Sequence, residues 1–377
     1  MNSASARSVA AAAIERISAG ERSGSVLAAV LADSELDDRD RAFVTALTLG
    51  TVRMQRACNH VIAPHLRRSP DADVAALLRM GAFQLIFLGT PRHAAVGETV
   101  EVASKKVGGF VNAILRRVAD DVQRGIIWPS DAVELSYPDW IVERFVTDWG
   151  DDGPAALAAM NEPEQAPSRS DGYIQGRASQ WVVTEVGAQP GEHVVDLCAA
   201  PGGKSTGLAA AGAIVTAVEL DEQRCKLLTD VVDRYGRDRI EVLCADGRDS
   251  GLLAGQADRV LVDAPCSGLG ALGRRADARW RVRQGDVERL AILQGELMKA
   301  AAALVRPGGE VIYSVCTLTG EESTDVIEAF VADTGFKPLD LVKPDRWRPT
   351  RLGYGGIVLP HDYQTDGMAV FRLGRPE

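Results

Sequence analysis

The sequence of 377 residues lacks the features that would make it a membrane or exported protein. No apolar run approaches the roughly 20 residues that a membrane-spanning helix needs. Near the N-terminus, Glu15 and Arg16 interrupt the Ala-rich stretch, which argues against the apolar centre of a signal peptide. We therefore expect a cytoplasmic protein with no membrane partner.

The sequence also lacks paired cysteines. Its six cysteines include no Cys-X-X-Cys pair, and this spacing argues against a zinc site and against a disulfide framework. We expect no metal, and we expect Cys58, Cys225 and Cys244 to be packing residues. The other three cysteines are Cys198, Cys266 and Cys316.

An excess of basic residues is absent as well. The chain has 42 Lys and Arg against 52 Asp and Glu, a formal net charge of −10, whereas binding to phosphates favours a basic surface. Two local clusters run against this sum. One holds five arginines and the other four: Arg274, Arg275, Arg279, Arg281 and Arg283, and Arg53, Arg56, Arg67 and Arg68.

Apolar periodicity divides the chain into three parts. Residues 1–127 show apolar side chains at intervals of three and four, which predicts an all-helical domain. Residues 128–179 are interrupted by prolines and polar stretches, which indicates a linker. Residues 180–377 alternate short apolar strands with helices, which predicts an α/β domain with a parallel sheet covered on both faces.

Each of the five expected strands leads to a polar or reactive residue. The strands end near Asp196, Glu219, Asp246, Asp263 and Cys316. In such sheets, ligands bind beyond the carboxyl ends of the strands. The pattern therefore predicts one site formed by all five positions.

The turn after the first strand predicts a cofactor without phosphates. It has Cys198 where a phosphate-binding loop needs its first glycine, and it does not fit the Gly-X-Gly-X-X-Gly pattern of dinucleotide folds. A nucleoside cofactor needs only a backbone that it can approach closely and a carboxylate that binds its ribose. We expect S-adenosylmethionine, with Glu219 at the ribose, Asp246 near the adenine and Asp263 at the reaction centre; as the alternative, Glu219 and Asp246 cap the helices that follow them.

Two cysteines follow neighbouring strands at the expected site. Cys266 stands in Asp263-Ala264-Pro265-Cys266-Ser267-Gly268, and Cys316 stands in Ser314-Val315-Cys316-Thr317. A thiolate that adds to carbon 6 of cytosine makes carbon 5 nucleophilic enough to attack a sulfonium methyl group, and an acid at ring N3 and the exocyclic amine stabilises the charge. Spacing alone does not show which cysteine attacks.

Three segments resemble motifs I, IV and VI of the RsmB/Sun (Fmu) family of RNA cytosine-5 methyltransferases. They are Cys198 to Lys204, Asp263 to Gly268 and Ser314 to Thr317, in that order. Segments of the N-terminal part, such as Arg39-Asp40-Arg41 and Phe110 to Arg117, resemble that family's NusB-like RNA-binding domain, and Pro360-His361 with Thr365-Asp366-Gly367 resembles its C-terminal motif. The resemblance implies a Rossmann-like class I methyltransferase domain preceded by an all-α NusB-like domain. It implies a cytosine in 16S (small-subunit) ribosomal RNA as substrate, and we expect a monomer.

The resemblance also implies roles for individual residues. Cys316 would attack the base, Cys266 would release the product and Asp263 would contact the base. The implied cofactor contacts are Cys198, Ala199, Ala200, Pro201, Gly202, Gly203, Lys204, Glu219, Asp246 and Asp263. The two basic clusters would then grip RNA phosphates through Arg274, Arg275, Arg279, Arg281 and Arg283, together with Arg53, Arg67 and Lys105.

The chain departs from the family pattern in two places. Between Ser168 and Tyr173 the family usually carries a small α/β RNA-binding subdomain of several dozen residues, so that the predicted subdomain is shortened here. Where the family usually has an acidic residue after the following glutamine, this chain has Gly176. A DNA or transfer-RNA cytosine methyltransferase and a non-catalytic RNA-binding or assembly factor are the alternatives.

Overall fold

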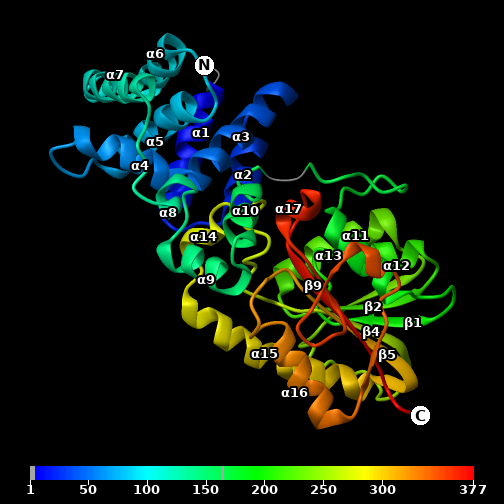
Figure 1. Ribbon diagram of the computed structural model, residues 1–377. Helices are drawn as coiled ribbons and strands as arrows, with labels where there is room; N and C mark the ends of the chain where they lie inside the picture. The colour runs from blue at the N-terminus through cyan, green and yellow to red at the C-terminus, as the bar shows by residue number, and fades with distance from the viewer. Residues whose placement is uncertain (1–4, 163–164) are drawn as a thin grey trace. The chain divides into compact units, whose positions relative to one another are not determined.

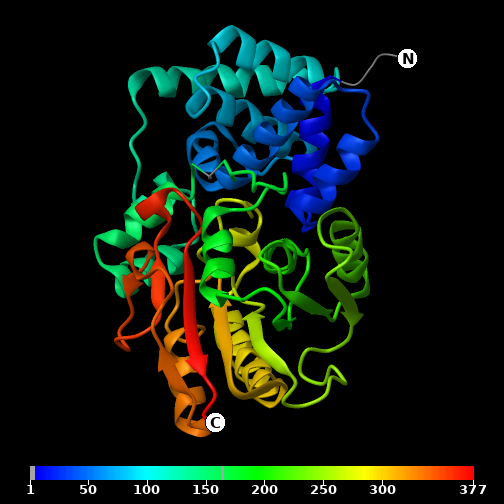
Figure 2. The ribbon, with the colours of Figure 1, turned by 90° about the vertical axis from the view of Figure 1, so that its right-hand side faces the viewer.

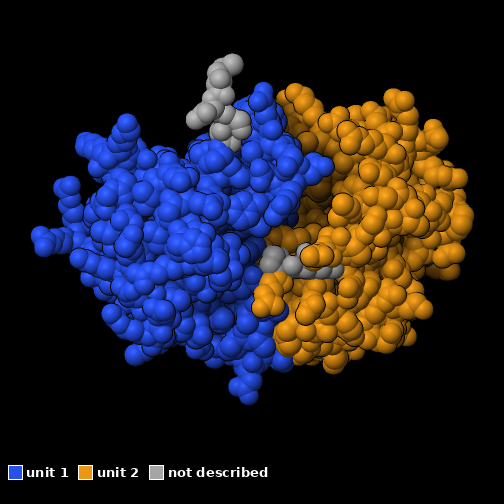
Figure 3. Space-filling view, turned by 90° about the horizontal axis from the view of Figure 1, so that it is seen from above, with its two compact units in different colours: residues 1–161, 275–281 blue, residues 162–274, 282–377 orange. Residues whose placement is uncertain are grey.

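The computed structural model describes residues 5–162 and 165–377. Residues 1–4 of the predicted helical domain and residues 163–164 of the predicted linker lie outside them. The chain forms two compact units, coloured separately in Figure 3. Unit 1 comprises Met1–Asn161 and Arg275–Arg281, and unit 2 comprises Glu162–Arg274 and Val282–Glu377. No helix of the described residues is long and apolar enough for a bilayer.

Unit 1 is helical, as its apolar periodicity predicts (Figure 1). Its core gathers fully buried side chains such as Ile14, Leu47, Leu78 and Leu115 from four different helices. The first seven helices are α1 (Ala6–Ser18), α2 (Ser23–Ala32), α3 (Asp38–Arg53), α4 (Gln55–Ile62), α5 (Ala72–Ile86), α6 (Arg92–Val102) and α7 (Gly108–Arg124), with the 3₁₀ turn η1 (Ala63–His65) after α4.

The predicted linker is wrong for its first part. The structure forms three further helices of unit 1 there: α8 (Asp131–Glu134), α9 (Asp139–Trp149) and α10 (Asp152–Ala159). Ile141 and Phe145 of α9 and Leu157 of α10 are buried, and the Tyr137 hydroxyl donates to the Leu157 carbonyl at 2.9 Å. Pro129 and Pro138 stand before helices, and Pro154 lies in the first turn of α10, where a missing N–H costs little.

A short segment from the later part of the sequence also belongs to unit 1. Arg275–Arg281 contains α14 (Ala278–Arg281), whose Arg279 is fully buried over the Tyr137 ring at 3.8 Å. The Arg279 guanidinium donates to the side-chain oxygen of Asn161 at 2.9 Å. Asp277, also buried, accepts hydrogen bonds from the Ser23 hydroxyl and from Arg281.

Unit 2 is built on one sheet with the strand order β3-β2-β1-β4-β5-β9-β8-β7, and β6 pairs with β9. The first five strands of this order are parallel, as the sequence predicts, and β9 is antiparallel to β5. The strands are β1 (His193–Asp196), β2 (Ile214–Glu219), β3 (Ile240–Cys244), β4 (Ala257–Asp263), β5 (Val305–Val315), β6 (Lys337–Leu339), β7 (Arg348–Pro349), β8 (Gly356–Val358) and β9 (Met368–Gly374).

Helices cover both faces of this sheet, which confirms the Rossmann-like fold (Figures 1 and 2). On one face of the sheet, the core packs Val182, Leu208 and Leu228 against strand residues such as Val215 and Leu261. The helices on that face are α11 (Arg177–Val186), α12 (Gly203–Ala210) and α13 (Glu222–Tyr235), and α15 (Gln284–Leu304) and α16 (Thr324–Thr334) lie on the other; the 3₁₀ turn η2 (Pro344–Arg346) and α17 (Pro360–Tyr363) belong to the C-terminal part.

Two cysteines that we expected to be packing residues are paired instead. The structure joins Cys225 and Cys244 by a disulfide, with their Cα atoms 6.1 Å apart. Cys244 ends β3 opposite Glu219 in the register of the sheet, and the Cys225 sulfur lies 3.2 Å from the Glu219 carbonyl oxygen. Spacing could not show this proximity, because it arises from the crossover through α13.

The buried Asp277 carboxylate predicts how firmly α2 is held. Asp277→Ala would leave the buried Ser23 hydroxyl without its acceptor, which costs about 1–3 kcal/mol. We expect hydrogen exchange of the α2 amides to accelerate by roughly 10- to 100-fold. Arg281→Ala, which removes only the half-exposed partner of the same carboxylate, should change exchange much less. Equal effects of the two substitutions would contradict this assignment.

Candidate active site

Five polar residues lie at one edge of the unit 2 sheet because the parallel strands all end there. Asp196, Glu219 and Asp263 are the last residues of β1, β2 and β4. Cys316 follows β5 directly, and Asp246 lies two residues beyond β3. On one side of β1 the sheet continues with β2 and β3, and on the other side with β4 and β5, so the direction in which strands are added reverses between β1 and β4. Open α/β sheets bind ligands at such a point.

The turn between β1 and α12 brings backbone close to the end of β2. Gly202 has a φ of +105°, which favours glycine, and a Cβ there would lie 2.9 Å from the Leu228 side chain. The Ala200 backbone N–H donates to the Glu219 carboxylate at 3.3 Å. Lys204 stands in the first turn of α12, so that the whole segment from Cys198 to Lys204 passes over the strand ends.

Glu219 is a buried carboxylate held on several sides. It is 4% exposed and accepts a second backbone N–H, from Asp221, at 3.1 Å. Arg224 of α13 forms an ion pair with it at 3.2 Å and also donates to the Ala200 carbonyl at 2.6 Å. These contacts fix the carboxylate at the edge where the sequence predicts a ribose-binding acid.

Asp263 lies between a cation and a hydroxyl. The Lys204 ammonium is 2.7 Å from one carboxylate oxygen, and the Ser314 hydroxyl donates to the other at 2.8 Å. Lys204 comes from α12, and Ser314 comes from β5, which pairs with β4. The carboxylate is therefore oriented by two fixed donors and is still partly open, with 28% of its side chain exposed.

Asp196 has a buried oxygen that nothing satisfies. The Ser205 hydroxyl donates to Oδ2 at 2.6 Å, whereas Oδ1 has no hydrogen-bond partner. Burial raises the pKa of Asp196 to about 6, the Ser205 hydrogen bond opposes the rise, and the neighbouring Asp263 charge adds to it. An unsatisfied carboxylate oxygen at the edge of the sheet is suited to a donor from a ligand.

The structure brings two of the predicted cysteines together. The sulfur atoms of Cys266 and Cys316 are 3.3 Å apart, and both side chains are partly exposed. Cys198 is partly exposed as well, and burial followed by the charges of Asp196 and Asp263 raises its thiol pKa well above the ordinary value. The raised pKa favours the protonated thiol of Cys198, whereas Cys266 and Cys316 are distinguished by the short distance between their sulfur atoms.

Sequence reasoning missed a carboxylate behind this pair. Glu322 is fully buried and accepts hydrogen bonds from Ser267, which follows Cys266, and from Thr317, which follows Cys316. The only signal in the sequence is an acidic residue a few positions after Cys316, and an acid in that place usually caps a helix.

Sequence reasoning also missed a hairpin over the cofactor turn. Ser168 and Ile174 form an isolated antiparallel bridge, and Arg169 donates to the Gly203 carbonyl at 2.7 Å. A Cβ on Gly203 would lie 3.1 Å from the Tyr173 ring. What remains of the shortened subdomain thus packs on the start of α12.

Gly176, the first glycine after this hairpin, lies against the Arg274 side chain. A Cβ on Gly176 would lie 3.0 Å from the Arg274 guanidinium, and Arg274 pairs with Asp366 of the C-terminal motif. Gly367 in that motif donates its N–H to the Gly270 carbonyl at 2.8 Å. Arg274 therefore occupies the space beside Gly176 where the family usually has an acid.

Asp246 is already paired in this structure. Arg248 contacts both of its oxygens, the shorter distance being 2.6 Å, and these hydrogen bonds lower the Asp246 pKa. The side chain is about one-third exposed, and it lies beyond the end of β3 as predicted. A contact with adenine would have to share this carboxylate with Arg248.

The predicted RNA-binding arginines divide into buried and exposed residues. Arg53 and Arg279 are 7% and 0% exposed inside unit 1, which corrects the prediction that they contact phosphates. A run of arginines has the same appearance in the sequence whether its side chains are solvated or buried. Arg274, Arg275, Arg281, Arg283, Arg67 and Lys105 are exposed, and of these Arg274 and Arg281 are paired with Asp366 and Asp277.

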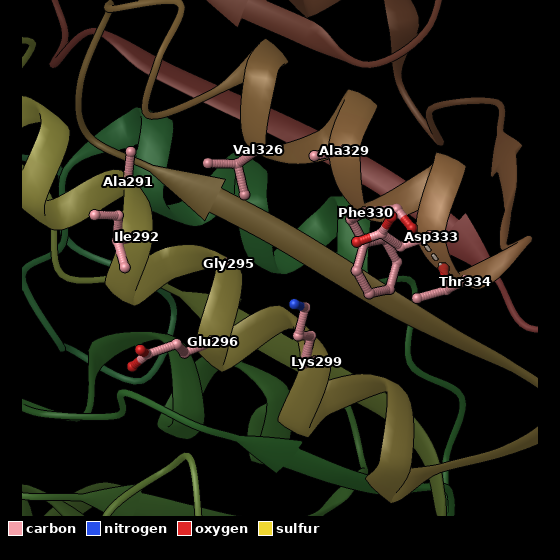
Figure 4. A pocket seen from close by; sticks show the side chains of 10 residues that line it. All are labelled: Ala291, Ile292, Gly295, Glu296, Lys299, Val326, Ala329, Phe330, Asp333 and Thr334. Carbon is pink, nitrogen blue, oxygen red and sulfur yellow. Dashed lines mark hydrogen bonds between the residues drawn. The ribbon is translucent and has the colours of Figure 1, made fainter.

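A separate hollow lies between α15 and α16 (Figure 4). It encloses about 350 Å³ and is lined by apolar side chains such as Ile292 and Phe330, with Glu296, Lys299 and Asp333 beside them. None of the predicted site residues lines it. Within residues 5–162 and 165–377, no group of three or more His, Cys, Asp or Glu side chains is arranged to hold a metal ion.

Comparisons with known proteins identify both units. A family model described as 16S rRNA methyltransferase RsmB/F matches residues 183–373, and a NusB family model matches residues 4–120. The chain is 33% identical to ribosomal RNA small subunit methyltransferase B of Thermus thermophilus, over 88% of each protein, and 31% identical to the Pseudomonas syringae protein of the same name, over 86% of each. The crystal structure of PH0851 shares the fold, with a TM-score of 0.78 at 23% identity and 98% coverage of both chains.

The raised pKa of Asp196 predicts a pH dependence of stability. The folded state binds this proton more tightly than the unfolded state, so its stabilising contribution is complete below about pH 4 and is lost as the pH rises through about 6. Asp196→Asn cannot ionise. Without cofactor, its free energy of unfolding relative to the wild type should rise by about 3 kcal/mol between pH 4 and pH 7. Urea denaturation across this range measures the difference, and a constant difference would contradict the assignment.

Proposed function

The chain belongs to the 16S rRNA methyltransferase RsmB/F family, and from this premise we propose that it methylates carbon 5 of a cytosine in 16S ribosomal RNA through a covalent adduct with Cys316. The observation that carries the proposal is the pair of sulfur atoms, 3.3 Å apart, at the same edge of the sheet as Asp263. A methyl transfer to oxygen or nitrogen needs no thiol, whereas a transfer to carbon 5 of cytosine needs a nucleophile that first adds to the ring.

The residues at the ends of β1 and β2 fit S-adenosylmethionine, the cofactor of this family. The Glu219 carboxylate would accept hydrogen bonds from the ribose hydroxyls, and Asp196 Oδ1 is a buried acceptor without a donor of its own. The backbone around Gly202 approaches closely because no side chain intervenes. When bound, the cofactor supplies an electrophilic methyl group on a sulfonium ion.

The first step belongs to Cys316. Its thiolate adds to carbon 6, and the electron pair of the carbon 5–carbon 6 double bond moves to carbon 5. Carbon 5 then takes the methyl group as the bond between that group and the sulfonium sulfur breaks, which leaves a neutral thioether. Asp263, held by Lys204 and Ser314, would accept a hydrogen bond from the exocyclic amine, a donor that cytosine has and uracil lacks. This contact selects cytosine as the base.

The second step belongs to Cys266. It removes the proton from carbon 5, the electron pair of that C–H bond restores the double bond, and the bond between carbon 6 and the Cys316 sulfur breaks. Cys316 leaves as a thiolate and Cys266 keeps the proton until it exchanges with water. The two sulfurs thus act in sequence on adjacent carbons of one ring.

The RNA itself would reach the site as an unpaired base. Sequence-specific RNA recognition favours loops whose bases can be turned outward into a pocket. Of the predicted phosphate contacts, Arg67, Lys105, Arg274, Arg275, Arg281 and Arg283 have exposed side chains and remain candidates. A substrate in transfer RNA or DNA would use the same chemistry. We favour 16S RNA because the family model that matches half of the chain is described as a 16S rRNA methyltransferase.

Substitution of the cysteines tests the covalent mechanism. With 16S RNA and S-adenosylmethionine, Cys316→Ala should show no turnover and no adduct, because the attacking sulfur is gone. Cys266→Ala should accumulate a protein–RNA adduct that survives a denaturing gel, because release is blocked.

The double substitution Cys266→Ala with Cys316→Ala is the matched control, and it should abolish the adduct. The reverse pattern, with an adduct in Cys316→Ala, would show that Cys266 is the nucleophile. No adduct in any variant would favour a non-catalytic role in RNA binding.

A further inference from the structure

The carboxylate of Glu322 is buried without a cation. Its side chain is fully enclosed between the end of β5 and the start of α16, and no ion pair involves it in the described parts of the chain. A buried charge is costly unless hydrogen bonds satisfy it. Its surroundings therefore have to supply several donors.

Five donors from neutral groups surround it. Oε1 accepts from the Ser267 backbone N–H at 2.7 Å and from the Gln294 amide at 3.2 Å. Oε2 accepts from the hydroxyls of Ser267 at 2.5 Å, Thr319 at 3.1 Å and Thr317 at 3.2 Å. The two oxygens thus face different kinds of donor, amide groups on one side and hydroxyl groups on the other.

This network holds the loops that carry both sulfurs. Ser267 follows Cys266 and Thr317 follows Cys316, and their hydroxyls are themselves 2.9 Å apart. Gln294, from α15, also donates to the Pro265 carbonyl at 2.9 Å, so that the residues on both sides of Cys266 are held.

The network is anchored to the sheet as well. The Tyr313 hydroxyl of β5 donates to the Glu322 carbonyl at 2.6 Å and so fixes the backbone of Glu322. Both cysteine loops therefore depend on one side chain whose own place is set by the sheet.

We infer that Glu322 is a positioning residue that fixes Cys266 against Cys316 and thereby couples release of the product to formation of the adduct. The inference rests on the proposed two-cysteine function. Glu322 acts through the residues that donate to it, among them Ser267 and Thr317, because its carboxylate is buried. Loss of this network should move Cys266 relative to the adduct and should slow the second step more than the first.

The split between the two oxygens predicts which substitution is tolerated. In Glu322→Gln the carboxamide oxygen can take the Oε1 place, where amide donors require an acceptor. Its NH₂ group can take the Oε2 place, because hydroxyl groups can rotate to accept. Glu322→Ala removes the acceptor that these five donors share.

The test compares adduct and turnover in the full chain. With 16S RNA and S-adenosylmethionine, Glu322→Ala should lose at least about 10-fold in turnover and accumulate gel-stable adduct as Cys266→Ala does, although Cys266 is present. Glu322→Gln should stay within a few-fold of the wild type in both measurements. Affinity for S-adenosylmethionine should be unchanged in both variants, because none of the Glu322 contacts is with the cofactor turn.

Thr317→Val decides the matter if Glu322→Ala yields no folded protein. It keeps the side-chain shape and removes the hydroxyl that joins Ser267 to Glu322, and it should raise the ratio of adduct to turnover. A parallel fall of adduct and turnover, or wild-type behaviour of Glu322→Ala and Thr317→Val, would overturn the inference while Cys266→Ala still forms adduct. Absence of adduct in Cys266→Ala would instead overturn the proposed function.

Discussion

The constraint on which unit 2 depends is that its parallel strands all end at the same edge of one sheet. This arrangement gathers Asp196, Glu219 and Asp263, whose like charges repel one another at short range. Two of them have a cation of their own: Lys204 for Asp263 and Arg224 for Glu219. Asp196 accepts a hydrogen bond from the Ser205 hydroxyl, and burial raises its pKa to about 6. The fold therefore creates both the site and the electrostatic cost of the site.

The carboxylates on the cofactor side and Glu322 near the sulfur atoms are stabilised by different kinds of partner. On the cofactor side, ion pairs hold carboxylates that remain partly accessible to a ligand, as with Asp263. On the sulfur side, neutral donors enclose Glu322, and the cysteines next to them stay open. A cation beside the sulfurs would favour the thiolate at all times. Neutral donors fix the position of Cys266 and Cys316 without adding that charge.

Much of the site could be predicted from the sequence because strand ends are local features. Asp196 and Cys316 follow short apolar runs, and the parallel sheet then brings such ends together. Arg279 could not be placed, because its burial depends on the packing of α14 in unit 1. The Cys225–Cys244 pair and Glu322 depend on crossovers and loops whose contacts span many residues. Local pattern predicted the strands and their ends, but it missed α8, α9 and α10 and the contacts between distant elements.

The central claim is methylation at carbon 5 of cytosine, and nucleoside mass spectrometry tests it most directly. The purified chain would be incubated with unmodified 16S RNA and methyl-labelled S-adenosylmethionine, and the RNA would then be digested to nucleosides. The account predicts label in 5-methylcytidine alone, and none when the Cys316→Ala variant replaces the wild type. Label in a base methylated on nitrogen, or in a ribose methylated on oxygen, would contradict it.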